Sequence, residues 1–304
     1  MVDIKRTIFR IRTLRIISLI VFFSLFNAVL FGFEALPLLL PVLQSLGSPA
    51  TTVGDAFAAM QYMFWDATFP WLPIASFFIV AVLLGRTLCG WVCPFGFVQE
   101  ILGYIKRKHM EISPRTHKDI INIKYLILGV ILFISITVSV TSVMGIDRNY
   151  KNALGIFAQA PFNALSPHDT LFATLPILTS RSLSGDAPFN DALSGIGSLT
   201  PLFWTRLVIL GLALAFAIYT PRSWCRYFCP VGAIMAILNR FSFLGLKRDV
   251  IHCTKESCRA CVEACPMKVP ILDLPWEKFS HPECIYCLEC VDACTTKALK
   301  PRIP

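Results

Sequence analysis

The sequence predicts a mainly α-helical protein, in which a four-helix transmembrane module precedes a small, cysteine-rich α+β domain. Apolar residues make up 55% of the 304 residues and charged residues only 15%, against about 25% charged in a typical soluble domain. The mean hydropathy is +0.64. Eight of the twelve cysteines follow residue 252 and are closely spaced. These observations exclude a disordered, collagen-like or simple soluble protein.

Four apolar segments reach the roughly 20 helical residues that a bilayer core of about 30 Å requires. We expect these helices at residues 14–33, 71–88, 123–144 and 202–220. The third is rich in β-branched residues, as a buried strand is, but its length favours a helix. The stretch 153–179 is broken by three prolines, which predicts an interfacial or re-entrant loop.

The positions of the positive charges predict the orientation. Residues 1–15, 89–122 and 221–304 carry five, five and twelve Lys and Arg, whereas 34–70 carry none and 145–201 carry three. Basic connections stay inside, so we expect a multi-pass protein of the plasma or inner membrane with both termini in the cytoplasm. The net charge of +9 then needs no nucleic-acid partner. The first segment has the basic start of a signal peptide, but its long apolar run favours a retained anchor.

A repeat follows the second and fourth predicted helices. Arg86-x2-Cys89-x3-Cys93-Pro94-x-Gly96 matches Arg222-x2-Cys225-x3-Cys229-Pro230-x-Gly232 at a constant offset of 136 residues. Short apolar helices are expected after each copy. Cysteines at i and i+4 share a helix face, so two such helix ends bring four thiols together. The interpretation is a candidate metal centre or redox dithiol at Cys89, Cys93, Cys225 and Cys229, and the alternative is that these small residues only pack.

The tail carries a stronger pattern. Cys253-x4-Cys258-x2-Cys261-x3-Cys265-Pro266 precedes Cys284-x2-Cys287-x2-Cys290-x3-Cys294. The C-x2-C-x2-C-x3-C spacing is that of bacterial two-cluster ferredoxins, in which the fourth cysteine of each run binds the other [4Fe–4S] cluster. The sequence therefore predicts a ferredoxin-like domain over 248–304 after a membrane domain over 1–247. The predicted ligands are Cys253, Cys258, Cys261 and Cys294 for one cluster, and Cys284, Cys287, Cys290 and Cys265 for the other.

Zinc is the alternative for these thiols, but zinc sites use well-separated C-x2-C pairs and not two triplets with a distant fourth cysteine. Two departures from the ferredoxin spacing bear on the assignment. The first gap is four residues, which puts Cys253 in doubt as a ligand, and Cys294 is followed by Thr295 instead of proline.

On these motifs the chain resembles the NapH-type membrane ferredoxin-like proteins, a group that includes MauN and the membrane core of NosR. The resemblance covers about residue 14 to the end. It implies two [4Fe–4S] clusters and electron transfer from quinol to a partner redox subunit, in the manner of a quinol dehydrogenase component. The C-x3-C-P pairs of these proteins match Cys89, Cys93, Cys225 and Cys229 of this chain.

Two functions follow from this reading. The first is a membrane-bound iron–sulfur protein that passes electrons between the quinol pool and a partner of ferredoxin or cytochrome type. The alternative is a maturation or regulatory factor that uses the same clusters to reduce a metal or to sense redox state. Arg86 and Arg206 are expected to extend to the membrane interfaces.

Overall fold

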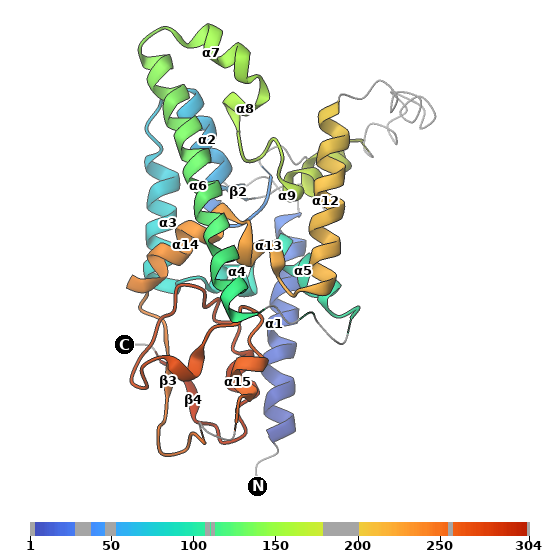
Figure 1. The fold of residues 1–304 in the computed structure, drawn as a ribbon, viewed down its shortest axis with the longest axis vertical. Helices are drawn as coiled ribbons and strands as arrows, with labels where there is room; N and C mark the ends of the chain where they lie inside the picture. Colours follow the sequence, from blue (N-terminus) through green and yellow to red (C-terminus); the bar gives the residue numbers. More distant parts are fainter. Residues whose placement is uncertain are drawn as a thin grey trace.

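The structure is a computed structural model that describes residues 4–27, 38–45, 53–106, 110, 113–178, 201–254 and 258–302. Long helices form the upper part of the molecule, and a small domain rich in loops forms the lower part (Figure 1). Both ends of the described chain lie in the lower part. The chain is mainly helical, as predicted.

The upper part contains two short strands and most of the helices. Its elements are α1 (Ile4–Phe26), β1 (Leu39–Leu40), β2 (Gly54–Asp55), α2 (Ala56–Trp65), α3 (Trp71–Leu84), α4 (Thr87–Trp91), α5 (Pro94–Gly103), α6 (Pro114–Val143), α7 (Asp147–Leu154), α8 (Ile156–Gln159), α9 (Pro167–Asp169), a π-helical turn η2 (Thr170–Thr174), α12 (Pro201–Tyr219), α13 (Ser223–Tyr227), α14 (Pro230–Leu238) and η4 (Asn239–Phe241). The lower domain contains β3 (Gly245–Arg248), α15 (Ala260–Glu263), η5 (Ile271–Asp273), α16 (Glu289–Asp292) and β4 (Leu299–Arg302).

Helix α6 has a largely apolar surface on its exposed face as well as on most of its buried face. Its buried residues recur every three or four positions, at Lys124, Leu128, Ile131, Ser135 and Val138. The outward face is also apolar, with Leu126 70% and Phe133 68% exposed. A water-facing helix would carry polar groups there. The outer face of α6 is therefore suited to lipid.

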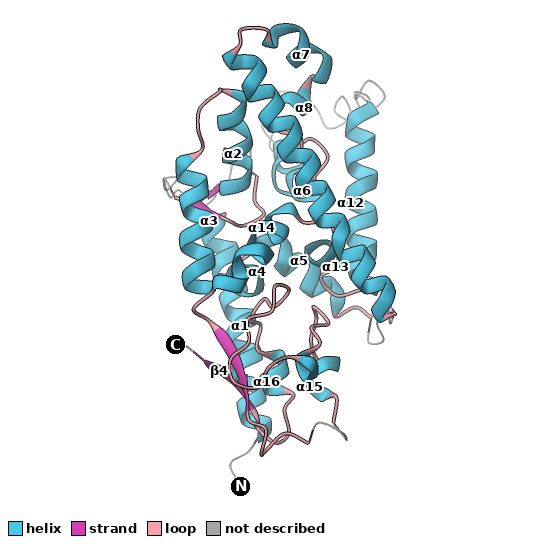
Figure 2. Ribbon diagram, turned by 60° about the vertical axis from the view of Figure 1, so that its left-hand side comes forward, coloured by secondary structure: helices cyan, strands magenta, loops and turns pink. Residues whose placement is uncertain are grey.

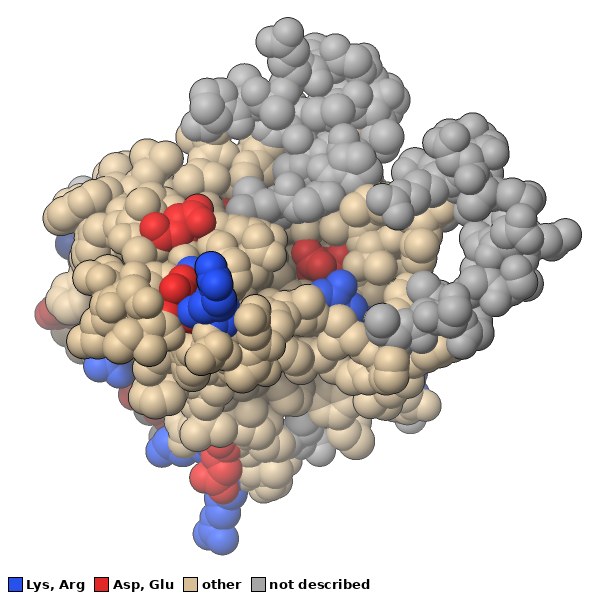
Figure 3. Space-filling model, turned by 90° about the horizontal axis from the view of Figure 1, so that it is seen from above, with Lys and Arg blue, Asp and Glu red and all other residues tan. Residues whose placement is uncertain are grey.

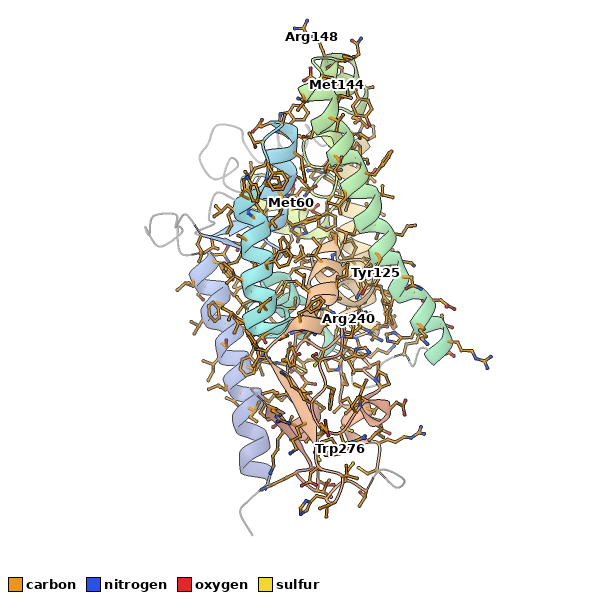
Figure 4. All side chains as sticks on the ribbon, turned by 90° about the vertical axis from the view of Figure 1, so that its left-hand side faces the viewer. Met60, Tyr125, Met144, Arg148, Arg240 and Trp276 are labelled. Carbon is orange, nitrogen blue, oxygen red and sulfur yellow. The ribbon has the colours of Figure 1, made fainter. Side chains whose placement is uncertain are left out.

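Two helices among the described residues are long and apolar enough to cross a membrane, and they lie at residues 115–143 and 201–219. They correspond to the third and fourth predicted helices, and they indicate that the protein is membrane-associated. Met144 and Arg148 lie at one end of the molecule and Trp276 at the other (Figure 4). Seen from the Met144 end, charged side chains are few among the described atoms (Figure 3).

The second predicted helix is shorter than expected. α3 ends at Leu84 instead of continuing to residue 88, because Gly85 takes a left-handed conformation with φ of 58°. The chain then turns into the separate short helix α4. At about 1.5 Å per residue, the 14 residues of α3 span less than a bilayer core.

The first helix begins earlier than predicted, at Ile4 instead of residue 14, and residues 28–33 of the prediction lie outside the described part of the chain. The lower half of α1 runs beside the lower domain (Figures 1 and 2). Arg15 of α1 is buried there and forms an ion pair of 2.8 Å with Glu289. The basic segment before the apolar run is therefore part of α1, and it packs along the surface of the lower domain.

The stretch 153–179, expected to form an interfacial or re-entrant loop, contains several short helical pieces instead. Pro167 begins α9, and residues beyond 178 lie outside the described part. In the lower domain, β3 pairs antiparallel with β4, with Gly245 opposite Arg302 and Arg248 opposite Leu299. This ladder joins the start of the domain to its end, and β3 begins before the predicted boundary at residue 248.

Candidate iron–sulfur site

The eight tail cysteines lie around two separate cavities. One cavity is lined by Cys253, Cys258, Cys261 and Cys294. The other is lined by Cys265, Cys284, Cys287 and Cys290. Each set combines three cysteines from one run with the last cysteine of the other run. The structure thus groups the thiols in the two sets that the sequence pattern predicts, and Cys253 reaches its set despite the longer gap.

The backbone of the tail explains how the thiols converge. Tyr286 and Leu288, which flank Cys287, have left-handed conformations with φ of 49° and 62°. This curvature wraps the loop around the second cavity. The short helix α15 carries Cys261, and Cys265 lies two residues after the end of this helix. Such a helix moves the fourth cysteine of the run to the other cavity.

Burial makes the thiolate forms of the cysteines around the second cavity unfavourable unless a cation lies beside them. It raises the pKa of Cys284 to about 12 and raises the pKa of Cys287 and Cys290 further above the ordinary value. A buried thiolate is therefore costly unless a cation offsets its charge. Iron bound by thiolates supplies that charge.

The arrangement of the donors can be compared with what a cluster and a single ion require. In the described part of the chain, no group of three or more His, Cys, Asp or Glu side chains is arranged to hold one metal ion. A zinc ion would draw four sulfurs to about 2.3 Å from one point. A [4Fe–4S] cluster binds each thiolate at a different corner of a cube, and four cysteines lining one cavity are compatible with that arrangement.

The C-x3-C-P copies have the same local structure. In each copy a five-residue helix, α4 or α13, is followed by a cysteine that caps the next helix and by a proline at that helix's first position. Proline fits there because the first helical N–H has no partner within the helix. The thiol of Cys229 also accepts a hydrogen bond of 3.1 Å from Gly232 N. The short helices expected after each copy are α5 and α14.

The two copies interlock. Arg222 of the second copy donates to the carbonyls of Cys89 (2.5 Å) and Gly90 (3.3 Å) in the first. A Cβ added at Gly232 would lie 3.2 Å from Nη2 of Arg86, and one added at Gly96 would lie 3.4 Å from Nη1 of Arg222. Each arginine therefore crosses to a glycine of the opposite copy, where an added Cβ would be tightly packed.

The four repeat thiols are neighbours, and all except the half-buried Cys89 are buried. Burial raises the pKa of Cys93 to about 12, and the neighbouring thiols Cys225 and Cys89 raise it further. The pKa of Cys229 is also raised, by burial and by the neighbouring thiols Cys225 and Cys89. Gln99 donates a hydrogen bond of 3.2 Å to the sulfur of Cys225. The arrangement offers four sulfurs beside two buried guanidinium groups, which suits a negatively charged metal–thiolate centre or a dithiol.

The prediction for Arg86 was wrong. Arg86 is fully buried and does not extend to a membrane interface. It donates to the carbonyl of Pro282 at 2.9 Å and forms an ion pair of 2.9 Å with Glu283. Lys124 of α6 binds the same carboxylate at 2.5 Å. Burial disfavours the carboxylate, but Arg86 and Lys124 outweigh it and lower the pKa of Glu283 to about 2.

This buried triad of Arg86, Lys124 and Glu283 joins the helices to the lower domain directly before Cys284. Trp91 Nε1 also donates to the carbonyl of Tyr286 at 2.9 Å. Tyr125 and Arg240 lie at the level where the helices meet the lower domain (Figure 4). The first C-x3-C-P copy therefore contacts the loop that carries Cys284 and Cys287. No spacing pattern in the sequence marks the triad, although a lone lysine in an apolar helix is a signal of function.

Comparison with known proteins gives the class of the chain. A family model described as a 4Fe-4S binding domain matches residues 69–112 and 202–249, the two regions that contain the C-x3-C-P copies. An uncharacterized protein of Methanocaldococcus jannaschii, MJ0750, is 28% identical over 73% of this chain and 74% of its own length. No solved structure matches the chain. The chain is therefore similar to iron–sulfur proteins of the ferredoxin type.

Two further relatives have descriptive names. The putative electron transport protein YccM of Escherichia coli is 24% identical over 73% of this chain and 52% of its own length, so the match spans about half of that relative. The methylamine utilization ferredoxin-type protein MauN of Methylobacillus flagellatus is 25% identical over 82% of this chain and 75% of its own length. NapH, NosR and NirI proteins match as well. The resemblance to the NapH, MauN and NosR type of ferredoxin-like protein is thereby confirmed.

Proposed function

We propose that this chain is a membrane-bound iron–sulfur protein that passes electrons between the quinol pool and a partner redox protein. The observation that carries the proposal is the grouping of the eight tail thiols around two cavities. The proposed ligands are Cys253, Cys258, Cys261 and Cys294 for one [4Fe–4S] cluster, and Cys265, Cys284, Cys287 and Cys290 for the other. Such clusters exchange single electrons with little rearrangement.

The chain's own residues would adjust the reduction potential at these sites. Val269 N donates to the sulfur of Cys265 at 3.4 Å, and the thiols of Cys287 and Cys290 are buried. Hydrogen bonds to sulfur and exclusion of water both tune cluster potentials. The loop that carries Cys284 and Cys287 also contacts the first C-x3-C-P copy, which supports electron transfer across that contact.

The proposal extends to the repeat thiols. Cys89, Cys93, Cys225 and Cys229 would form a further redox centre, either a metal–thiolate site or a dithiol pair. Arg86 and Arg222, both at least 98% buried, would offset its negative charge. The match of a 4Fe-4S binding model to these two regions supports this role.

The proposed membrane arrangement has the four spans that the sequence predicts, at residues 14–33, 71–88, 123–144 and 202–220, with both termini in the cytoplasm. The second of these spans requires α3 together with the adjoining α4, because α3 alone is shorter than a bilayer core. The basic connections on one side of these helices support the arrangement. In this arrangement residues 1–247 form the membrane domain and residues 248–304 form the cytoplasmic cluster domain, with partner redox subunits reached from the cytoplasm.

A direct experiment tests the electron-transfer function. The full chain is isolated without oxygen, oxidised, and mixed with a reduced short-chain quinol analogue. We expect the broad iron–sulfur absorbance to bleach, and we expect the Cys89→Ser/Cys225→Ser variant to lose this bleaching while dithionite still reduces its tail clusters. If quinol bleaches the double variant as fast as it bleaches the parent chain, the repeat thiols have no place in the electron path.

A second function is favoured by one observation, the match to NosR proteins that are named as regulatory. In that case the clusters would reduce a metal ion or sense redox state, and the four repeat thiols would bind the metal ion. Reduction of an added copper(II) salt by the dithionite-reduced chain, without any bleaching by quinol, is the result that favours this function.

A further inference from the structure

A cavity of about 530 Å³ lies between the helices and the lower domain. Residues of α1 and α5, the turn from α12 into α13, and the loop after Cys265 line it. In Figure 1 this is the region around the lower ends of α5 and α12, beside α1. The cavity is separate from the two cavities of the tail thiols, although Cys265 contributes to its wall.

The lining is strongly cationic. Three arginines in the wall are at least 97% buried, namely Arg15, Arg222 and Arg226. Three further cations, Arg12, Lys106 and Lys268, line the cavity with exposed side chains. Only three carboxylates oppose these six charges, namely Glu100, Glu263 and Glu289. The surplus of positive charge indicates that the cavity attracts an anion.

Two of the three carboxylates in the wall already form ion pairs with two of the buried arginines. Glu100 pairs with Arg222 at 2.5 Å and also binds Arg15, which pairs with Glu289 as well. Arg226 makes no ion pair within the described part of the chain. Its Nη2 lies 3.0 Å from His117 Nδ1, and its guanidinium lies 4.9 Å from the ring centre of Tyr227.

Three buried donors in the wall also lack a hydrogen-bond partner among the described residues. They are Nε of Arg15, Nε of Arg226 and the hydroxyl of Thr220. Leaving buried polar groups unpaired is costly, and each of these groups lies in a residue that lines the cavity. These three atoms are themselves shielded from solvent, so a ligand with several acceptor oxygens and negative charge would reach them through small movements of the wall side chains.

We propose that this cavity binds a phosphate group. A phosphate presents several acceptor oxygens, and planar guanidinium groups bind it through charge-assisted hydrogen bonds. The group would be the headgroup of an anionic phospholipid or a soluble phosphate compound. Since α12 is a candidate span and Thr220 follows its last residue, the cavity would lie at headgroup depth. The proposal is argued from the arginines and Thr220 and not from the clusters, although Cys265, a proposed cluster ligand, forms part of the wall.

The test uses the full chain in two settings. In nanodiscs of phosphatidylcholine with and without phosphatidylglycerol, native mass spectrometry counts retained phosphatidylglycerol. In detergent, calorimetric titration measures the binding of inorganic phosphate. The variants are Arg226→Gln and Thr220→Val, with Arg240→Gln as a matched control because Arg240 is an exposed cation that does not line the cavity.

We expect the parent chain and the control to bind, and Arg226→Gln to weaken binding by about tenfold or more, the effect of losing charge-assisted hydrogen bonds. Thr220→Val is expected to weaken binding less than Arg226→Gln. It provides the test of the site if the Arg226→Gln variant does not fold. Selective retention of phosphatidylglycerol supports a lipid source, and phosphate binding without lipid selectivity supports a soluble source. Failure of the parent chain to bind either probe overturns the proposal, as does an equal loss in Arg240→Gln.

Discussion

Gly90 of α4 lies directly against the carbonyl of Ile285, so that a Cβ at position 90 would be 2.5 Å from that oxygen. The contact joins the first C-x3-C-P copy to the loop between Cys284 and Cys287. Only a glycine allows the two backbones to approach this closely. The region of the repeat thiols is therefore in direct contact with the cluster domain.

The first prediction concerns this contact. Gly90→Ala is expected to destabilise the protein by about 1–3 kcal/mol, as overpacking does, and to slow reduction of the tail clusters by quinol. The measurement is thermal unfolding together with the rate of absorbance bleaching. Gly103→Ala is the matched control, because Gly103 lies in a helix with nothing within 4 Å of an added Cβ. Equal behaviour of the two variants would contradict a close approach at Gly90.

The second prediction concerns the buried triad. Glu283→Gln leaves Arg86 and Lys124 buried without their carboxylate, and breaking a buried ion pair costs about 3–5 kcal/mol. We expect a large fall in melting temperature and loss of the signal of the cluster next to Cys284. Glu277→Gln is the control, because Glu277 is exposed and makes no ion pair within the described residues. Stability equal to that of the control would show that the triad does not hold the domain in place.

The third prediction tests the crossed ligand sets. Cys265 belongs to the first run by sequence but lines the cavity of the second run. Cys265→Ser is therefore expected to remove the same electron paramagnetic resonance signal as Cys290→Ser, and a different one from Cys261→Ser. Each variant should retain about four of about eight iron atoms. A Cys265→Ser spectrum that matches that of Cys261→Ser would refute the crossed arrangement.

The fourth prediction concerns pH. Burial raises the pKa of Asp55 to about 8, against the opposing backbone hydrogen bonds from Ala58 and Phe57. The facing His168, whose Nε2 lies 3.8 Å from the carboxyl, has its pKa lowered by burial to about 3 and is neutral. The nearby Asp169 raises the pKa of Asp55 further.

The folded state therefore keeps a proton on Asp55 that the unfolded chain loses above about pH 4. Stability should fall as pH rises from about 4 to about 8 and should be independent of this group above that range. Asp55→Asn keeps the helix cap and should remove this part of the pH dependence. Melting temperatures of both proteins between pH 5 and 9 give the comparison, and parallel curves would contradict the raised pKa.

The features of the structure that depend on the local spacing of residues could be predicted from the sequence. The tail cysteines could be sorted into two sets because a tight loop and a following short helix determine where each sulfur goes. The spans at α6 and α12 could be predicted within a few residues at most ends because prolines and long apolar runs mark them. The start of α6 lay nine residues before the prediction, since Pro114 begins the helix in a polar segment.

Contacts between distant residues could not be predicted in this way. Glu283 meets Arg86 and Lys124 across 197 and 159 positions, and no spacing rule links them. The end of α3 was missed because a single glycine with positive φ interrupts an otherwise continuous apolar run. The role of Arg86 was missed for a related reason, since its burial depends on a domain almost 200 residues away.

The central claim is that the eight tail thiols hold two [4Fe–4S] clusters. Low-temperature electron paramagnetic resonance of the full chain, isolated without oxygen and reduced with dithionite, tests it most directly when combined with iron analysis of the same sample. We predict about eight iron atoms per chain and the spectrum of two magnetically interacting reduced clusters. A colourless, iron-free chain, or one that carries zinc at these thiols, would contradict the claim.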